Sequence, residues 1–76
     1  MRDNMILVAK IYAWKDETHT HTLTIWNPKY SGWYYVYVDG IKIYISNAFE
    51  CAFDEALEYA NKVCVWNGWN SRREDI

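Results

Sequence analysis

With 76 residues and a formal charge of −2, the chain has room for one domain and one hydrophobic core. Ten acids against eight bases leave too little positive charge for an ordinary nucleic-acid binder and too little negative charge for a DNA mimic. Aromatic residues make up 18 %, and five Trp and seven Tyr outnumber two Phe. Because Trp and Tyr are enriched at binding hot spots, the composition indicates an interaction surface.

The N-terminal residues and the cysteines predict a reduced, cytoplasmic protein. Residues 1–4 lead directly into a strand-like segment without a signal-peptide cleavage site, and no apolar run reaches the length of a membrane span. Cys51 and Cys64 would lie roughly 20 Å apart on one helix, from a rise of about 1.5 Å per residue, which is beyond disulfide reach. We expect two reduced, buried thiols.

Two segments with a period of two open the chain. Residues 5–14 predict a strand whose wholly apolar side should face the core. That side comprises Met5, Leu7, Ala9, Ile11 and Ala13. Residues 18–26 predict a second strand with a row of threonines on one side, which suits an exposed pleated surface, and with Leu23 and Ile25 on the other.

The strongest local signal is a predicted hairpin formed by residues 33–38 and 41–46. Asp39-Gly40 between them suits a type I′ turn, whose two central residues need a positive φ. This turn predicts the register, because directly opposite residues share a face. Val38 would oppose Ile41, Val36 would oppose Ile43, and Tyr34 would oppose Ile45, all on an aliphatic core face. Tyr35 would oppose Tyr44 on the other face.

A helix is expected over about residues 49–66, because apolar residues recur there at helical spacing. Its start stays open: Asn47 could cap it with Glu50 three residues later, or a short connection over residues 49–51 could precede a helix that begins near Ala52. Asn67-Gly68 predicts a C-cap, and residues 70–76 predict a frayed tail. The sequence therefore predicts an α+β fold for the single domain 1–76. Its architecture would be a four-stranded antiparallel meander packed on one C-terminal helix.

One helix covers one face of a sheet, so the other face is expected to be open and to bind a partner. An acidic helix side could dock on a basic surface, where it would set orientation and speed encounter. The candidate partner-binding residues on the sheet and helix are Tyr12, Trp14, Trp26, Trp33, Tyr35, Tyr37, Lys42, Tyr44, Asp54, Glu55 and Glu58.

Metal binding and catalysis are not expected. His19 and His21 share a strand face near Asp16 and Glu17, but further ligands for zinc are not evident. Neither cysteine can be paired with a histidine from spacing, and no serine lies in a glycine-rich elbow. We expect no catalytic residue, metal or cofactor.

The hairpin and helix resemble the AP2-type and integrase arm-binding DNA domains. The resemblance covers Gly32-Trp33-Tyr34-Tyr35-Val36-Tyr37-Val38-Asp39-Gly40-Ile41-Lys42-Ile43, followed by Phe49, Glu55-Ala56 and Tyr59-Ala60. It implies a sheet face that enters the major groove through Trp33, Tyr35, Tyr37, Lys42 and Tyr44. Those families carry several basic residues there and this chain carries Lys42, so DNA reading is the second hypothesis.

The run Asp54-Glu55-Ala56-Leu57-Glu58 with Ala60 is similar to the helix start of a phage inhibitor of bacterial RNA polymerase. The small, acidic, aromatic-rich profile also resembles anti-CRISPR proteins, and the helix resembles antitoxins of the HicB type. This resemblance implies a phage or mobile-element inhibitor that acts in the host cytoplasm.

The first hypothesis is thus a non-enzymatic module that occludes a site on a host protein complex through its aromatic sheet face and acidic helix. The alternatives are a sheet-reading DNA-binding domain and a homodimeric, antitoxin-like structural protein that pairs through the open sheet face. A membrane partner is not expected, and nucleic acid ranks below protein.

Overall fold

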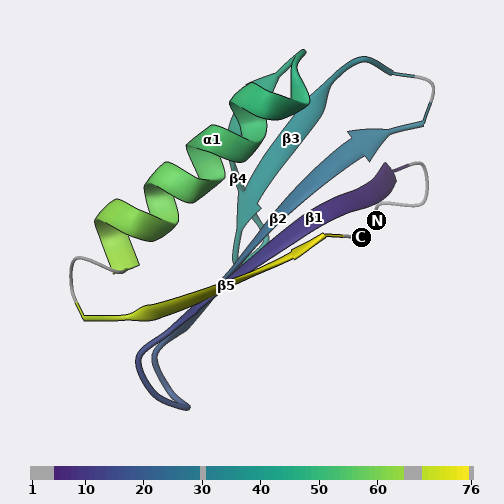
Figure 1. The fold of residues 1–76 in the computed structure, drawn as a ribbon. Coiled ribbons are helices and arrows are strands. Elements are labelled where there is room, and N and C mark those ends of the chain that lie inside the picture. The colour runs from purple at the N-terminus through teal and green to yellow at the C-terminus, as the bar shows by residue number, and fades with distance from the viewer. Residues whose placement is uncertain (1–4, 30, 65–67, 76) are drawn as a thin grey trace.

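The computed structural model describes residues 5–29, 31–64 and 68–75, and its fold is α+β (Figure 1). The strands β1 (Met5–Trp14), β2 (Thr20–Pro28), β3 (Tyr34–Val38) and β4 (Ile41–Ser46) precede helix α1 (Phe49–Tyr59). A π-helical turn, η1 (Ala60–Cys64), and strand β5 (Asn70–Asp75) follow. All neighbouring strands are antiparallel, in the order β4-β3-β2-β1-β5. The predicted fold class is confirmed, with a fifth strand added.

The predicted frayed tail is wrong for residues 70–75, which form β5. This strand pairs with β1 from Trp14↔Asn70 to Ala9↔Asp75. Its sequence, Asn-Ser-Arg-Arg-Glu-Asp, contains no apolar residue, so it carries no hydrophobic period from which a strand can be predicted. Because β5 pairs along one edge of β1 and β2 pairs along the other, most of β1 is an interior strand of the sheet.

The helix begins at Phe49, a start that the sequence left open, and changes its hydrogen-bonding pattern before its expected end. The α-helical part ends at Tyr59, and residues 60–64 continue as a π-helical turn. Residues 65 and 66, the last of the predicted helix, lie outside the described residues, as does Asn67 of the predicted cap. Gly68 has a φ of +84°, which glycine adopts without a steric cost.

Strand β2 begins at Thr20, two residues later than predicted, because Asp16 holds the preceding residues in the turn. The Oδ1 atom of Asp16 accepts hydrogen bonds from the backbone N–H groups of Thr18 and His19, both at 2.9 Å. A side chain that satisfies two consecutive N–H groups fixes a local turn in place of a strand ladder.

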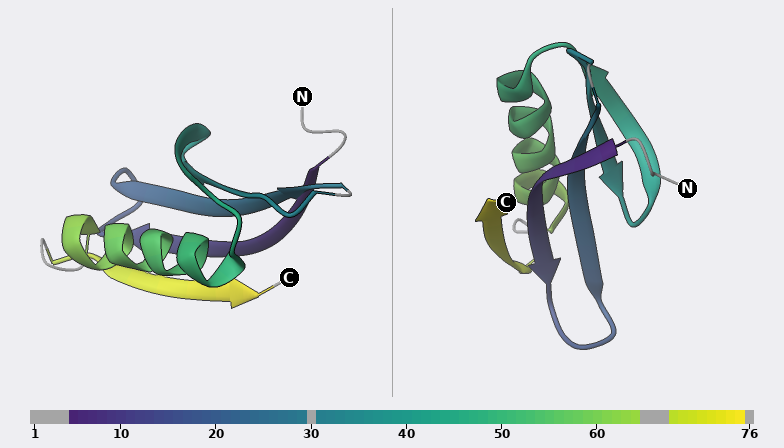
Figure 2. Two further views of the ribbon diagram at one scale, coloured as in Figure 1. Left: turned by 90° about the horizontal axis from the view of Figure 1, so that it is seen from above. Right: turned by 90° about the vertical axis from the view of Figure 1, so that its right-hand side faces the viewer.

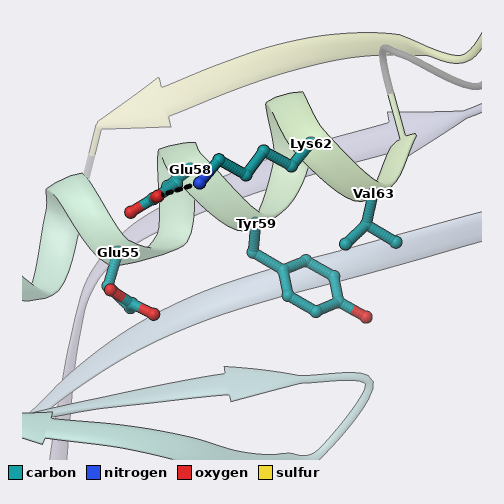
Figure 3. A pocket seen from close by; sticks show the side chains of 5 residues that line it. All are labelled: Glu55, Glu58, Tyr59, Lys62 and Val63. Carbon is teal, nitrogen blue, oxygen red and sulfur yellow. Dashed lines mark hydrogen bonds and ion pairs between the residues drawn. The ribbon is translucent and has the colours of Figure 1, made fainter.

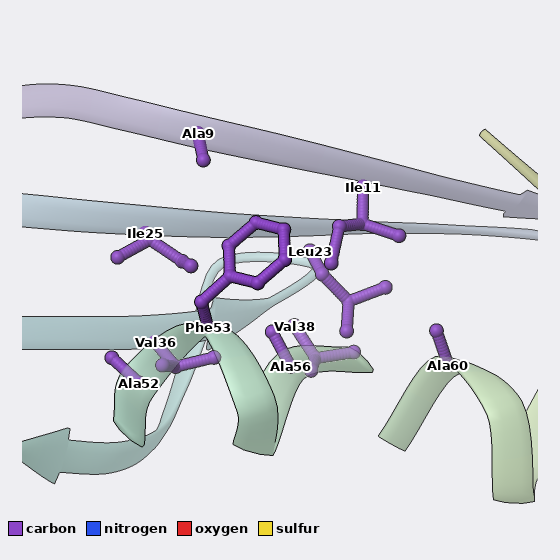
Figure 4. Packing of buried hydrophobic residues seen from close by; sticks show 10 residues of the cluster. All are labelled: Ala9, Ile11, Leu23, Ile25, Val36, Val38, Ala52, Phe53, Ala56 and Ala60. Atoms are coloured by element: carbon purple, nitrogen blue, oxygen red, sulfur yellow. The ribbon is translucent and has the colours of Figure 1, made fainter. Parts of the chain in front are cut away.

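The core lies between the helix and one face of the sheet (Figure 4). Helix α1 packs on β2, β3 and β4, and η1 packs on β1 and β5. Phe53 extends from α1 toward the sheet, where Ile11 and Ile25 surround it. No polar side chain is buried among the described residues. The buried core cluster is Ala9, Ile11, Leu23, Ile25, Val36, Val38, Ala52, Phe53, Ala56 and Ala60.

A register shift in β1 corrects the predicted core at its N-terminal end. Between Leu7 and Ala9 the pairing with β2 slips by one residue, so Leu7 lies opposite Trp26 and Ala9 lies opposite Ile25. Since a slip of one residue exchanges the two faces of a strand, Met5 and Leu7 do not continue the buried row that begins at Ala9.

A second shift, in the β3–β4 hairpin, corrects the predicted register. Val38 opposes Ile41 as expected, but past the shift Val36 opposes Tyr44 and Tyr35 opposes Ile45. Ile43 is the extra residue, and the predicted Val36–Ile43 and Tyr35–Tyr44 pairs are wrong. The isoleucines at 41, 43 and 45, expected in the core, are 69 %, 41 % and 44 % exposed.

Tyr44 changes face for the same reason. It was expected beside Tyr35 on the open face, whereas it packs against the core cluster next to Val36. The Asp39-Gly40 turn itself forms as predicted, with positive φ at both residues. A turn sets the register of its nearest pairs, and a bulge further along the strand resets it.

The helix lies along one side of the sheet only (Figure 2). No helix or strand covers the opposite side within the described ranges, and every buried residue of the core cluster belongs to the covered side. We call the uncovered side the open face.

The corrected register predicts unequal losses of stability on substitution of two neighbouring residues of β4. Tyr44→Ala should lower the free energy of unfolding by about 2 kcal/mol because Tyr44 packs on the core, whereas Ile43→Ala should lower it by less than about 1 kcal/mol. Urea denaturation of both variants measures this difference. The hairpin register expected from the turn alone gives the reverse order, with Ile43→Ala as the costly change.

Candidate binding surface

The open face is built from rows of side chains that run across the strands. One row crosses all five strands: Glu74, Lys10, Thr24, Tyr37 and Lys42. A second row contains Leu7, Trp26, Tyr35 and Ile45, and shorter rows contain Arg72, Tyr12 and Thr22, and Asn70, Trp14 and Thr20. Partners in an antiparallel pair share a face, so the register alone fixes this set.

Most of the predicted sheet-face residues lie together on the open face. These are Tyr12, Trp14, Trp26, Tyr35, Tyr37 and Lys42. Trp33 lies just before β3 and is 50 % exposed. Tyr44 lies on the covered side, so it does not contribute to this surface.

Cations lie over the tyrosine rings of the open face. The Nζ atom of Lys42 is 5.2 Å from the ring centroid of Tyr35. On the neighbouring part of the sheet, Lys10 Nζ and Arg72 Cζ lie 6.0 and 5.5 Å from the ring centroid of Tyr12. Contacts of this kind hold long, flexible cationic side chains above the sheet and reduce the entropy that they lose when they bind.

Polar groups are interspersed among the rings. Trp26 Nε1 donates a hydrogen bond to Thr24 Oγ1 at 2.9 Å, and threonines line β2 on this face. The surface is therefore amphipathic, with aromatic area for contact and hydroxyl groups for hydrogen bonding. Such a surface suits a macromolecular partner better than a small molecule, because the hollows found in the described part of the chain are shallow and open to solvent.

Charge is divided between the two sides of the molecule. The open face carries Lys10, Lys42 and Arg72 with one carboxylate, Glu74, which lies 3.7 Å from Arg72. The predicted acidic residues Asp54, Glu55 and Glu58 belong to α1, on the covered side. The aromatic face and the acidic helix consequently point in different directions and cannot meet one flat partner surface together.

A shallow hollow of about 280 Å³ lies beside the helix, lined by Glu55, Glu58, Tyr59, Lys62 and Val63 (Figure 3). Glu58 and Lys62 form an ion pair beside it, and the hydrogen bond that Lys62 Nζ donates to the Glu58 carboxylate raises the pKa of Lys62. Both side chains are more than half exposed, so the pair adds little stability. The hollow is open to solvent, and nothing in its lining indicates a ligand.

The two histidines contact different aspartates in different turns. His19 Nδ1 lies 2.9 Å from Asp16 in the β1–β2 turn, whereas His21 Nδ1 lies 2.5 Å from Asp39 in the β3–β4 turn. The His21 ring also stacks on Trp69, with centroids 5.1 Å apart. Across the described residues, no three His, Cys, Asp or Glu side chains gather closely enough to hold a metal ion.

Both cysteines are free, and they differ in exposure. Cys64 is buried as predicted, whereas Cys51 is exposed, so the expectation of two buried thiols is wrong for Cys51. Burial raises the pKa of the Cys64 thiol, and the negative charge of Asp39 raises it further. Since the thiolate is the nucleophile, this environment disfavours reactivity at Cys64 although a His21–Asp39 pair lies nearby.

Sequence reasoning missed Arg72 and Glu74, which reach the open face through β5. Arg72 and Glu74 lie on one face of β5 and Arg73 lies on the other, as in any strand. Because the residues on both faces are polar, the sequence of β5 cannot be distinguished from that of a polar tail. Arg73 faces the other way, 4.5 Å from the ring centroid of Phe53. No side-chain signal marked this strand, because residues 70–75 contain no apolar position and β5 pairs with residues 9–14 of β1 through the main chain.

Comparisons with known proteins give no assignment: no protein-family model matches the chain, and neither the curated proteins nor the solved structures yield a match. Among the helices of the described residues, none is long and apolar enough to traverse a bilayer. The functional argument consequently depends on the geometry of the chain itself.

Asp39 connects the hairpin that carries Tyr35, Tyr37 and Lys42 to β2. Its Oδ1 atom accepts the backbone N–H of Thr22 at 2.9 Å, and its Oδ2 atom contacts His21. Burial acts to raise the Asp39 pKa, but the Thr22 amide and His21 outweigh it, so the pKa lies below its ordinary 3.8. A carboxyl whose pKa is lowered on folding stabilises the protein above pH 3.8, and this contribution is lost as the pH falls through the folded pKa.

Asp39→Asn tests this linkage, because Asn also tolerates the positive φ of the turn. The variant should be less stable than the wild type at neutral pH, and the difference should shrink once the pH falls below 3.8. Urea unfolding across this pH range measures both. A difference that stays constant with pH would mean that the Asp39 charge does not stabilise the fold.

Proposed function

We propose that the protein is a non-enzymatic binding module that docks the open face of its sheet on a protein partner. The proposal depends on one observation: the open face, over which no other element of the described residues lies, is rich in aromatic rings and cations. Tyr12, Trp26, Tyr35 and Tyr37 lie there with three cations. Tyr, Trp and Arg are the residues that dominate binding energy at protein interfaces.

The charge on this face specifies the partner's surface. With Lys10, Lys42 and Arg72 against Glu74, the face complements an acidic patch, although the whole chain has a formal charge of −2. The acids of α1 point away, where they repel a second acidic surface and so favour one orientation on the partner. Such a module would act by occupying a site on a larger complex, as the resemblance to small phage-encoded inhibitors implies.

Paired substitutions test the proposal. Tyr35→Thr removes a ring of β3 from the open face and keeps a β-branched residue in the strand, so we expect a native fold with partner affinity reduced about 30-fold. Lys42→Gln should weaken binding, whereas Lys15→Gln, an exposed lysine in the β1–β2 turn, should not. The measurement is quantitative capture from the native host with each variant as bait, followed by titration of the captured protein.

Circular dichroism and urea midpoints establish that each variant is folded. If Tyr35→Thr and Lys42→Gln bind as tightly as the wild type, the open face is not the binding surface. Loss of binding in Lys15→Gln to the same extent would indicate a general charge effect.

A sheet-reading DNA-binding domain is the second candidate, and one observation favours it. Arg72 on β5 adds a third cation to this face, beside Lys10 and Lys42. Three phosphate contacts predict weak binding, with a slope of log affinity against log salt of about −3. Titration of duplex DNA at several salt concentrations measures that slope, and no binding at low salt would exclude this candidate.

A further inference from the structure

The two edges of the sheet differ in the way they meet solvent. Edge strand β5 is polar throughout, with Arg72, Arg73 and Glu74 exposed. Charged side chains of this kind prevent an edge from pairing with another chain. Edge strand β4 has the sequence Ile-Lys-Ile-Tyr-Ile-Ser, and its three isoleucines are exposed.

The main chain of β4 pairs with β3 on one side, and no strand of the described ranges lies on its other side. Strand β4 contains no proline and one charge, Lys42. A shallow hollow of about 370 Å³ follows the strand, lined by Lys42, Ile43, Tyr44 and Ile45. An apolar edge without a protecting charge row is a template for strand addition.

We propose that β4 pairs with β4 of a second copy of this chain, antiparallel and across a two-fold axis at Tyr44. In this register Ile43 of each copy lies opposite Ile45 of the other, and the two Tyr44 residues oppose each other. Ile45 shares the open face with Tyr35, and Ile43, two residues away, lies on that face too. The pairing therefore sets apolar side chains against each other on matching faces.

The same register avoids charge repulsion. Lys42 of one copy lies about four residues along the seam from Lys42 of the other, so the two lysines are about 13 Å apart, from roughly 3.3 Å per residue. A strand that is nearly neutral and matches itself in this way fits a second copy, since a two-fold interface requires one surface to be self-complementary.

Dimer formation would join the two sheets into one continuous sheet, with both open faces on the same side. The proposed partner-binding surface would then be doubled, and a partner with two acidic patches would bind with avidity. This inference is independent of the proposed function, because β4 can pair whether or not the open face binds a protein.

Charge substitutions at the seam test the register. Ile43→Lys and Ile45→Glu, each alone, should weaken dimerisation by about tenfold or more, because each places charges against isoleucine at two symmetric positions. The double variant, I43K with I45E in the same chain, sets Lys against Glu across the axis and should restore the dimer. Val63→Lys on η1 is the control, because Val63 has the same 41 % exposure as Ile43.

The measurement is sedimentation equilibrium from micromolar to millimolar concentration, with circular dichroism to establish that each variant is folded. Amide hydrogen exchange of the wild type should slow in β4 and not in β5 as the concentration rises. A wild type that stays monomeric at millimolar concentration overturns the proposal. So does a dimer that both single variants leave intact, or one that the double variant fails to restore.

Discussion

The rest of the structure depends on one constraint: a single short helical segment can cover only one of the two faces of a five-stranded sheet. Helix α1 and η1 cover one side of the sheet, and the ten residues of the core cluster all belong to that side. The chain has no further described element with which to cover the other side. Because the buried aliphatic residues pack on the covered side, the open face carries mainly rings, hydroxyls and cations, together with Leu7, Ile43 and Ile45. Its composition is what allows an uncovered sheet to remain compatible with water.

The division of charge follows from the same arrangement. Acids on α1 and cations on the open face are separated by the thickness of the sheet, so a nearly neutral chain presents two surfaces of opposite sign. Asp39 and the β3–β4 turn fix the hairpin to β2, and the cations lie over tyrosine rings. A partner therefore meets a surface whose polar groups already have defined positions, which lowers the entropy lost on binding.

The sequence was sufficient to predict the features that depend on residues close together in the chain. The hairpin turn, the presence of the helix, the buried Val36 and Val38, and the tyrosines of the open face all follow from period, turn chemistry and helical spacing. Two bulges were not predictable, because an extra residue in a strand leaves the alternating pattern intact on both sides and only shifts its phase. This is why Ile43, Ile45 and Tyr44 were placed on the wrong faces. Strand β5 was missed because its stability comes from main-chain pairing with β1, which its polar side chains do not signal.

The claim that the open face is the binding surface is tested most directly by photo-crosslinking. A photoreactive phenylalanine analogue in place of Tyr35, on the open face, is compared with the same analogue in place of Glu58, on the helix. Both positions are accessible enough to accept the side chain without unfolding the protein. The account predicts a specific crosslinked partner from position 35 and none from position 58. Crosslinking from position 58 alone would contradict it.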